Sequence, residues 1–298
     1  MSKFYLLVGA PASGKSTWAE ETYHMDDETY IVSSDMIRFE LFGDERIQRE
    51  PEKVFDIAHK RIINALRAGY EQVVFDATNI KRKHRIALMN KLKEFNCDKH
   101  CVIFAEPYEV LCARNKERSR QVPEEVIWRM LTQFEMPLET EGYDAIHIIN
   151  KNSIDCKKYV EFMKGFNQHN SHHKLDLYNH CLGAATYLLE AGMNWRFISA
   201  ALLHDVGKLF TQTYTNIKGE STEEAHYYGH QNYGAYLALI YNVGWLPSDR
   251  ITIAQLICYH MQPYFNKTEA ARCRWKENWG DELNDMIMIL HEADKYAH

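Results

Sequence analysis

Short apolar runs alternate with longer amphipathic stretches along the first 150 residues. Each run is long enough for one buried strand, and the runs lie at Phe4–Val8, Tyr30–Val32, Gln72–Phe75, Cys101–Ala105 and Ala145–Ile149. The stretches between them have helical spacing of apolar positions and predict helices over residues 15–23, 51–69, 82–95, 108–117 and 124–136. Strands and helices in alternation predict an α/β domain, with a parallel sheet and helices on both faces.

The pattern changes after about Asp155. Apolar positions keep helical spacing to the end of the chain, and no strand-like alternation is evident. A polar stretch at 167–174 (NQHNSHHK) has the composition of a loop, and its histidines at 169, 172 and 173 are expected to be solvated. The sequence therefore predicts two domains, an α/β domain at 1–155 and an all-α domain at 156–298.

The composition indicates where in the cell the protein is expected. None of the apolar runs among the 298 residues approaches the roughly 18 residues that a membrane helix needs. The apolar stretch after Met1 is too short for a signal peptide. The 7 cysteines form no CxxC pair, which favours reduced thiols over disulfides or a zinc knuckle. We therefore expect a cytoplasmic protein with no membrane contact.

Charge and histidine content narrow the function. The formal net charge is -6, whereas a protein that coats long nucleic acid is normally basic. Any nucleic-acid contact is therefore expected in a local groove, which is enough to recognise a strand end. Most of the 15 histidines lie after residue 150, which points to metal chemistry in the second domain.

A glycine-rich loop follows the first predicted strand. Residues 9–16 (GAPASGKS) fit the pattern GxxxxGK[ST] between a strand and a helix. Backbone N–H groups of such a loop wrap a β-phosphate, while Lys15 reaches the β- and γ-phosphates and Ser16 can ligate Mg²⁺. We therefore expect ATP and Mg²⁺ as cofactors. The loop residues expected to contact the nucleotide are Gly9, Ala12, Ser13, Gly14, Lys15, Ser16 and Thr17.

Polar residues follow the second and third predicted strands. Asp35 lies where a carboxylate can accept the proton of an attacking hydroxyl, and Arg38, one helical turn on, can clamp a substrate phosphate. The alternative for Asp35 is that it only caps the helix that begins near Met36. Asp76 closes the third strand, where it can hold Mg²⁺ directly or through water, or serve only in a turn.

Two basic clusters lie further along the first domain. KRKHR at 81–85 fits a solvated helix start. Arg114 and Arg118 are four residues apart on one expected helix face, ahead of a turn at 121–123. Arginines there suit a lid that closes over a triphosphate, and we expect Arg118 to take part in catalysis as well; surface ion pairs are the alternative.

Four segments of the first 150 residues resemble the kinase domain of the bacteriophage polynucleotide 5′-kinase/3′-phosphatase family. In chain order they are GAPASGKSTWAE, SSDMIR, FDATN and RNKERSRQVPEEVIWRM. The resemblance implies Lys15 and Ser16 at phosphate and Mg²⁺, Asp35 as general base for a 5′-hydroxyl, Arg38 as substrate-phosphate clamp, and Arg114 and Arg118 in a lid. The family reads Ser-Asp-Thr-Asn where this chain reads Asp-Ala-Thr-Asn, so the Asp76 carboxylate is displaced by one position and its role is open.

Histidine and aspartate recur at wide spacing in the second domain. His204 and Asp205 follow an apolar helical stretch, with His180 upstream and Asp294 close to the C-terminus. Imidazole nitrogen together with carboxylate oxygen suits Mn, Fe, Co, Ni or Zn. These residues predict a metal site, although each histidine taken alone can also be structural.

Three further residues extend this site. His230 and His260 can complete a second metal position, and two ions together can activate a bridging water and clamp phosphate oxygens. Lys208 lies one helical turn after His204 and can stabilise the negative charge that develops on a phosphate.

Residues 172–298 resemble the HD phosphohydrolase superfamily. The resemblance rests on His180, LLHDVGK, GHQNYGA, CYHMQP and the late Asp294, and the HD domain attached to bacterial tRNA nucleotidyltransferases is the most similar in character. It implies an all-helical domain that hydrolyses phosphoesters with one or two divalent ions such as Mn²⁺, Co²⁺ or Ni²⁺. Members act on nucleotides, cyclic dinucleotides and RNA ends, so the substrate stays open.

Taken together, the two halves resemble the bifunctional HD-domain polynucleotide kinases. The resemblance implies an end-healing repair enzyme, with an ATP-dependent 5′-OH kinase and a hydrolase for 2′,3′-cyclic or 2′/3′-phosphate ends. Its partners would be RNA or DNA ends and a separate polynucleotide ligase. Two rivals remain: a small-metabolite or nucleoside kinase fused to an HD nucleotidase, and an ATP-switched sensor without catalysis.

Overall fold

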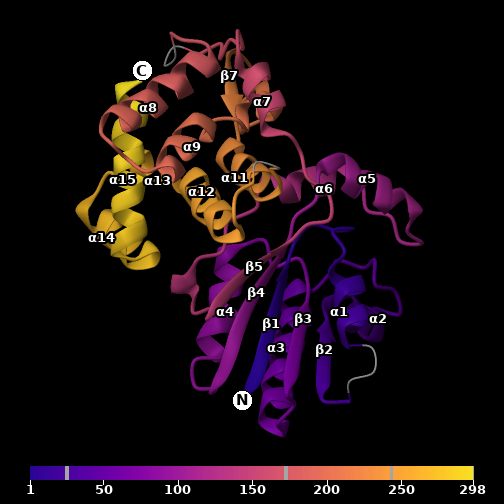
Figure 1. Cartoon of the computed structure of the whole chain (residues 1–298). Helices are drawn as coiled ribbons and strands as arrows, with labels where there is room; N and C mark the ends of the chain where they lie inside the picture. Colours follow the sequence, from indigo (N-terminus) through magenta and orange to yellow (C-terminus); the bar gives the residue numbers. More distant parts are fainter. Residues whose placement is uncertain (24–26, 171–173, 242–243, 298) are drawn as a thin grey trace. The chain divides into compact units, whose positions relative to one another are not determined.

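The computed structural model describes residues 1–23, 27–170, 174–241 and 244–297. The chain forms two compact units, Met1–Trp128 with Pro137–Lys151, and Arg129–Met136 with Asn152–His298 (Figure 1). Within the described ranges, no helix is long and apolar enough to cross a membrane. The division after residue 155 into separately folding domains stays a prediction.

Five parallel strands form the sheet of the first unit, in the order β2-β3-β1-β4-β5. Their bounds are β1 Ser2–Val8, β2 Thr29–Ser33, β3 Gln72–Asp76, β4 Cys97–Phe104 and β5 Ala145–Ile149. The parallel sheet expected from the sequence is confirmed. Because all strands run the same way, the carboxyl ends of β1, β2 and β3 meet along one edge of the sheet.

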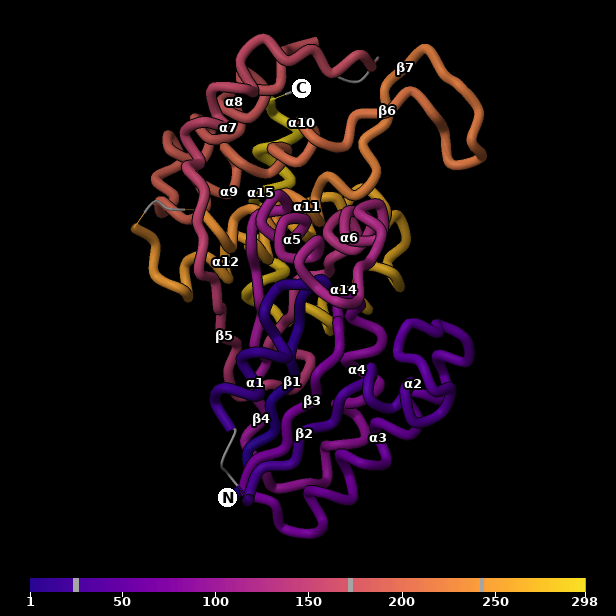
Figure 2. The backbone as a smooth tube through the Cα atoms, turned by 90° about the vertical axis from the view of Figure 1, so that its right-hand side faces the viewer, coloured from indigo at the N-terminus to yellow at the C-terminus, as the bar shows by residue number. Residues whose placement is uncertain are grey.

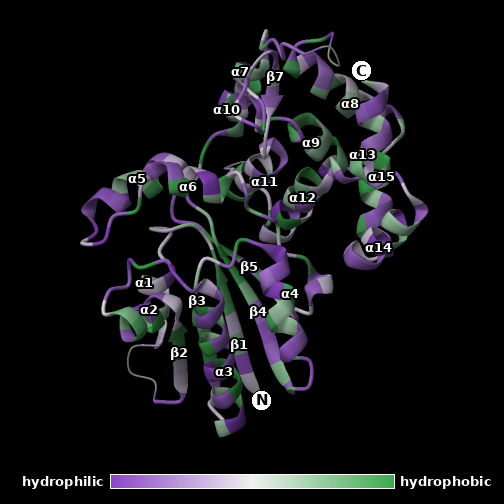
Figure 3. Cartoon of the chain, turned by 180° about the vertical axis from the view of Figure 1, so that it is seen from behind, coloured by the Kyte–Doolittle hydropathy of each residue, from purple (hydrophilic) through white to green (hydrophobic). Residues whose placement is uncertain are grey.

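Helices lie on both faces of this sheet. The helices between Lys15 and Leu131 are α1 Lys15–Tyr23, α2 Ser34–Phe42, α3 Pro51–Ala68, α4 Arg82–Lys91, α5 Tyr108–Glu117 and α6 Glu124–Leu131. Ala19 of α1 shares a buried cluster with Val74, while Phe55 of α3 packs edge-on against Phe75 with ring centroids 6.3 Å apart. Neighbouring strand residues point to opposite faces, so these two contacts mark the two faces. Figure 3 shows hydrophobic and hydrophilic positions side by side on α3, as its sequence pattern requires.

The basic cluster at 81–85 is only in part the solvated helix start that the sequence suggested, since Lys83 and His84 are exposed and Arg85 is not. Arg85 is fully buried, and its Nε and Nη2 atoms donate to the two carboxylate oxygens of Glu141, each at 2.8 Å. Its Nη1 donates to the backbone oxygen of Asn79 at 3.1 Å. Glu141 ends a short 3₁₀ helix, Glu139–Glu141, so the pair ties α4 to the connection before β5. The partners are 56 residues apart, and local sequence patterns carry no information about such a pairing.

Replacing Arg85 with methionine is expected to lower the free energy of unfolding by about 3–5 kcal/mol, because the buried Glu141 carboxylate would lose its bidentate partner and keep a longer contact, 3.6 Å, with Arg82. Urea unfolding followed by circular dichroism measures the change. Lys83→Met, at an exposed position of the same helix, is the matched control and should change stability by less than about 0.5 kcal/mol. Equal small changes in the two variants would contradict a stabilising role for the buried pair.

The second unit is mostly helical, as the sequence predicted. Its helices are α7 Cys156–Met163, α8 Leu177–Glu190, α9 Trp195–Leu203, α10 Lys208–Thr211, α11 His230–Ile240, α12 Pro247–Tyr259, α13 Gln262–Phe265, α14 Glu269–Trp279 and α15 Asp281–Tyr296. Helix α8 packs against α9 and α15, and α11 packs against α12. The core side chains Leu188, Ile257 and Leu290 are fully buried.

One expectation for this unit is wrong, because it contains two strands. Strands β6 Gln212–Thr215 and β7 Ser221–Tyr227 pair antiparallel, and Figure 2 shows them as an arm that extends from the helices. Gly219 closes the turn with a positive φ of 84°, and its N–H donates to the backbone oxygen of Asn216 at 2.9 Å. Most hairpin residues are exposed or half-buried, so the two faces differ too little to give an apolar alternation.

Candidate functional site

The glycine-rich loop joins the end of β1 to the start of α1. Ala12 and Gly14 adopt positive φ values of 62° and 96°, which turn the backbone back on itself. Gly9 lies so close to β4 that an added Cβ would approach the backbone oxygen of Phe104 to 2.7 Å. A glycine is therefore required at position 9 by packing as well as by any ligand.

Lys15 lies inside this loop. Its Nζ donates to the backbone oxygens of Gly9 and Ala10 at 3.0 and 2.8 Å, and the residue is 7% exposed. Burial lowers the pKa of the Lys15 ammonium to about 8, against the opposing effects of Asp76 and Asp35 and together with the repulsion of Arg118. A phosphate at this loop would raise that pKa again, because it supplies the negative charge that the buried ammonium lacks.

Ser16 and Asp76 come together beside the loop. The Ser16 hydroxyl donates to Asp76 Oδ2 at 2.6 Å, and Asp76 ends β3 with 8% exposure. Gly9 N–H donates to Thr78 O at 3.0 Å, which holds the end of β3 against the loop. A hydroxyl and a carboxylate oxygen in contact are hard oxygen ligands that fit Mg²⁺. This contact favours Mg²⁺ binding over a turn role for Asp76.

Asp35 lies in the first turn of α2, just past the carboxyl end of β2. The cap of this helix is Ser33, whose side chain accepts from Met36 N–H at 3.4 Å, so Asp35 is not needed for capping. Asp35 Oδ2 instead lies 2.5 Å from Arg120 Nη1. Arg38 is 6% exposed, and burial lowers its guanidinium pKa, an effect that Asp35 opposes and Arg120 reinforces.

The lid arginines differ from the sequence prediction in one respect. Helix α5 ends at Glu117, and Arg118 follows it in an extended conformation (φ −76°, ψ 146°), so Arg114 and Arg118 do not share a helix face. Arg114 Nη2 lies 3.2 Å from the carboxylate of the buried Glu106, while Arg118 is close enough to Lys15 to lower its pKa. Arg120, which the sequence reasoning missed, is the arginine that reaches Asp35.

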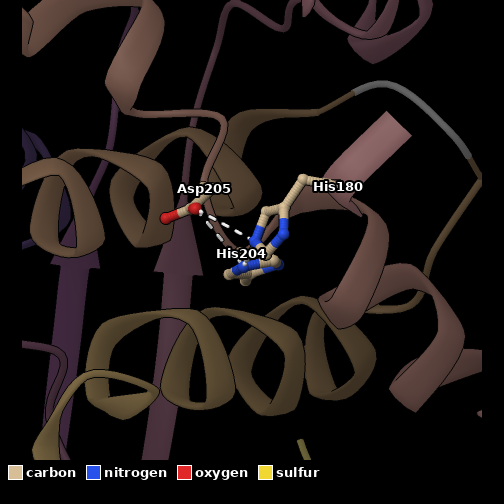
Figure 4. A group of neighbouring side chains, drawn as sticks. All are labelled: His180, His204 and Asp205. Atoms are coloured by element: carbon tan, nitrogen blue, oxygen red, sulfur yellow. Dashed lines mark hydrogen bonds and ion pairs between the residues drawn. The ribbon is translucent and has the colours of Figure 1, made fainter. Parts of the chain in front are cut away.

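A second cluster of titratable side chains lies within the helical unit. Helix α8 contributes His180, the turn after α9 contributes His204 and Asp205, and α15 contributes Asp294. Figure 4 shows the His180 side chain from α8 meeting those of His204 and Asp205 from the turn after α9. His230 begins α11 and His260 follows α12. All of these side chains are buried.

The distances join these residues into one centre. His180 Nε2 lies 3.1 Å from Asp294 Oδ1 and 3.5 Å from Asp205 Oδ2. His204 Nε2 lies 3.4 Å from Asp205 Oδ2 and 3.2 Å from His180 Nε2. On the other side of Asp205, Oδ1 lies 3.2 Å from His230 Nε2 and 3.6 Å from His260 Nε2.

The histidine rings all present the same nitrogen to this centre. Each Nδ1 atom lies within 3.3 Å of a backbone oxygen, and the partners of His180, His204, His230 and His260 are Ala297, Ala201, Tyr227 and Ile257. A carbonyl oxygen can only accept, so each Nδ1 carries a hydrogen. In the neutral tautomer, the Nε2 lone pairs of these histidines therefore point toward the carboxylates, as metal ligands do.

The donor set fits two metal ions that share Asp205. The ligand atoms of His180, His204 and Asp205 lie within 4.8 Å of one another, and so do those of Asp205, His230 and His260. Asp205 Oδ1, His230 Nε2 and His260 Nε2 are buried and find no hydrogen-bond partner among the residues described. Nitrogen and carboxylate ligands in this number suit transition-metal ions better than Mg²⁺.

The electrostatics of the centre also favour bound cations. Burial lowers the pKa of His204, but the adjacent Asp205 carboxylate outweighs it and raises that pKa well above its usual value. Burial raises the pKa of Asp205, yet Lys208 and His204 hold it well below its usual range. Asp205 therefore stays ionised and requires positive charge around it.

Three neighbours hold the ligands. Lys208 Nζ lies 2.6 Å from Asp205 Oδ2 and donates to Gln168 Oε1 at 2.9 Å. Its ammonium therefore already pairs with the candidate metal ligand Asp205 and is not directed only at a substrate. Tyr264 donates its hydroxyl to Asp294 Oδ2 at 2.8 Å, which leaves Oδ1 toward the histidines. The sequence reasoning missed Tyr264 and Gln168.

The loop prediction for 167–174 is confirmed for the described residues 167–170 and 174, which lie outside helices and strands, and His169 is exposed as expected. Gln168 is nevertheless buried, with 1% exposure. His172 and His173 lie outside the described residues. A buried glutamine in a polar segment has no local sequence signal, because its burial depends on Lys208, 40 residues away.

Two family descriptions match the chain. Residues 5–137 match the AAA domain family, and residues 177–298 match the HD domain family. The first match contains the glycine-rich loop, and the second contains the histidine–aspartate cluster that could hold metal ions.

Individual proteins are similar to only part of the chain and at low sequence identity. The L-seryl-tRNA(Sec) kinase of Methanococcus maripaludis is 28% identical over 167 residues, which are 55% of this chain and 63% of that protein. The chain thus spans less than two thirds of that relative. The Pnkp1/Rnl/Hen1 RNA repair complex is similar at 23% identity and a TM-score of 0.40, over 44% of this chain and 43% of the other. A gluconokinase from Sinorhizobium meliloti 1021 is similar at 18% identity and a TM-score of 0.36, over 49% and 81%.

Proposed function

We propose that a P-loop kinase domain and an HD domain act here on the two ends of one broken nucleic-acid strand. The kinase would phosphorylate a 5′-hydroxyl with ATP and Mg²⁺. The HD domain would remove a 2′,3′-cyclic phosphate or a 2′- or 3′-phosphate. Both products are the ends that a separate polynucleotide ligase joins.

One observation carries the kinase half of this proposal. The buried Arg38 has an Nη1 atom without a hydrogen-bond partner in the described parts of the chain, and its charge interacts with that of Asp35. A carboxylate suits an acceptor hydroxyl, and a buried guanidinium suits a phosphate that belongs to the same substrate. A 5′-OH strand end carries a hydroxyl and a nearby phosphate together, whereas a free nucleoside lacks the phosphate.

The kinase residues then have separate tasks. Asp35 accepts the proton as the 5′-oxygen bonds to the γ-phosphorus and the bond to the leaving ADP oxygen breaks. Lys15 neutralises charge on the β- and γ-phosphates, and Arg118 approaches them from the loop after α5. Ser16 and Asp76 would hold Mg²⁺, which supplies charge neutralisation between the β- and γ-phosphates.

In the HD domain, some residues would bind metal ions and others would hold these ligands in position. Asp205 and its histidines would hold Mn²⁺, Co²⁺ or Ni²⁺, which supply Lewis acidity and lower the pKa of a nearby water. Lys208 keeps Asp205 oriented, and Tyr264 keeps Asp294 oriented. The buried setting excludes bulk water and strengthens each of these contacts.

The curated relative supports an acceptor carried by RNA, since it is named as a kinase of a tRNA-linked seryl group. The competing function is a small-metabolite or nucleoside kinase fused to an HD nucleotidase. The net charge of -6 favours that rival, because it limits contact with long nucleic acid. Labelled ATP with 5′-OH RNA, 5′-OH DNA and free nucleosides separates the two: rapid labelling of nucleosides alone would overturn the polynucleotide assignment.

Arg38→Ala is expected to lower kcat/KM by about 10–150-fold on a substrate that has a phosphate beside the 5′-OH nucleoside. A bare nucleoside should be much less affected, because it offers Arg38 no anion. Initial rates on a nucleoside 3′-phosphate and on the matching nucleoside measure the difference. Equal losses on both substrates would remove the phosphate clamp and strengthen the metabolite-kinase rival.

A further inference from the structure

We propose that Arg120 covers the Asp35 carboxylate until a substrate phosphate draws it away, so that Arg120 selects 5′-OH ends with an adjoining phosphate over free nucleosides. This inference rests on the proposed kinase function and assigns a specificity-determining residue to the same site.

The inference rests on the short ion pair between Arg120 and Asp35. Arg120 Nη1 lies 2.5 Å from Asp35 Oδ2 and 3.8 Å from Glu45 Oε1. The Arg120 side chain is 14% exposed, while the side chains of Asp35 and Glu45 are 43% and 40% exposed. The guanidinium thus lies under two carboxylates, and one of them is the candidate base.

The backbone around Arg120 is held in place. The buried side chain of Asn115 spans the loop after α5: its Nδ2 donates to Val122 O at 2.7 Å and its Oδ1 accepts from Val122 N–H at 2.9 Å. Gln121 Nε2 donates back to Lys116 O at 2.8 Å. With its neighbours tied in this way, Arg120 can change partners through its side-chain torsions alone.

The positively charged side chains around Asp35 can accommodate one more anion. Arg38 and Arg120 both interact with the Asp35 charge, and Arg120 disfavours the charge of Arg38. Lys15 and Arg118 add positive charge on the P-loop side. A substrate phosphate near Arg38 would offer Arg120 a second acceptor, and a guanidinium binds phosphate at least as well as carboxylate in bidentate geometry.

Moving Arg120 changes what Asp35 can contact. While the Arg120 guanidinium lies on Asp35 Oδ2, that oxygen cannot accept a proton from the 5′-hydroxyl. Transfer of Arg120 to the phosphate opens Oδ2 to the 5′-hydroxyl. The proton of the hydroxyl then goes to Asp35 while the oxygen attacks the γ-phosphorus of ATP. A nucleoside cannot trigger this exchange.

The test compares a nucleoside 3′-phosphate with the matching nucleoside in wild type and Arg120→Ala, with ATP and Mg²⁺. Arg120→Ala should lower kcat/KM for the 3′-phosphate and leave the nucleoside unchanged or faster. The preference for the phosphorylated substrate should therefore shrink by about 10–150-fold. Arg120→Lys should recover part of the preference, because it restores charge without the bidentate fork. Arg46→Ala is the matched control: this arginine is 72% exposed, pairs with Asp44, and should keep the wild-type preference.

An unchanged preference in Arg120→Ala, or equal losses on both substrates, would overturn the inference. If wild-type protein phosphorylates neither substrate, the proposed kinase function fails separately. Binding then decides the role of Arg120. Calorimetry should find the nucleoside 3′-phosphate bound more tightly by wild type than by Arg120→Ala, and equal affinities would reject the inference.

Discussion

Asp205→Ala is expected to abolish phosphoester hydrolysis and to strip metal from the HD domain. Asp205 belongs to both ligand groups, so its loss leaves two imidazoles in each. Activity on 2′,3′-cyclic phosphate ends should fall below about one hundredth of wild type, since even outer partners of metal ligands are worth 10–100-fold. Mass spectrometry of bound metal after loading with Mn²⁺, Co²⁺ or Ni²⁺ gives the second readout.

Two other variants make this test specific to the shared carboxylate. His260→Ala removes a ligand from one group only, and His204→Ala removes one from the other. Each should retain more metal than Asp205→Ala, although hydrolysis should be lost in His204→Ala. Asp285→Asn, at an exposed position of α15, should keep both metal and activity. Wild-type metal content in Asp205→Ala would show that these groups are not the ligand sets, and an unchanged far-UV circular dichroism spectrum would show that the helical unit is folded.

Mg²⁺ should distinguish the two active sites. The kinase pair Ser16 and Asp76 offers oxygen ligands, whereas the HD centre offers mainly imidazole nitrogen. Kinase activity should therefore be full with Mg²⁺ alone, while hydrolysis should be low until a transition-metal ion is added. Full hydrolysis with Mg²⁺ alone would contradict the assigned ligand chemistry.

Local patterns accounted for most of the fold. The strands of the first unit were predictable because buried parallel strands are short, apolar and bounded by turn residues, as in Phe4–Val8 before its glycine loop. Helix α3 was predictable from its proline start and glycine end. The hairpin β6–β7 was not, because its solvated residues lack the alternation that marks a half-buried strand. Arg85 was misjudged for a different reason, since its partner lies far along the chain.

The candidate site residues also divide into those that the sequence could predict and those that it could not. Residues with unusual types at marked positions, such as Lys15 and the His204–Asp205 pair, could be named from sequence. The contacts that define their chemistry could not. That Asp205 belongs to both metal groups depends on α8, α11 and α12 meeting in space. That Arg120 rather than Arg118 reaches Asp35 depends on where α5 ends and on how Asn115 closes the following loop.

The second large effect concerns the general base of the kinase. Asp35→Ala should lower kcat for phosphorylation of a 5′-OH end by about 10²–10⁴-fold, because the attacking hydroxyl would have no positioned proton acceptor. Lys15→Ala should abolish the same reaction, since the phosphates would lose their buried cation. Asp44→Asn is the control: Asp44 pairs with Arg46 and should retain wild-type activity.

Hydrolysis by the HD domain should stay nearly intact in Asp35→Ala and Lys15→Ala, because neither residue belongs to its ligand groups. Radiolabel transfer from γ-labelled ATP gives kcat, and release of phosphate from a 3′-phosphorylated oligonucleotide gives the second activity in the same preparation. If Asp35→Ala keeps more than about a tenth of the wild-type kcat, Asp35 is not the base, since general-base catalysis is worth at least 10²-fold. Its pairing with Arg120 would then serve only to hold the loop after α5 against α2.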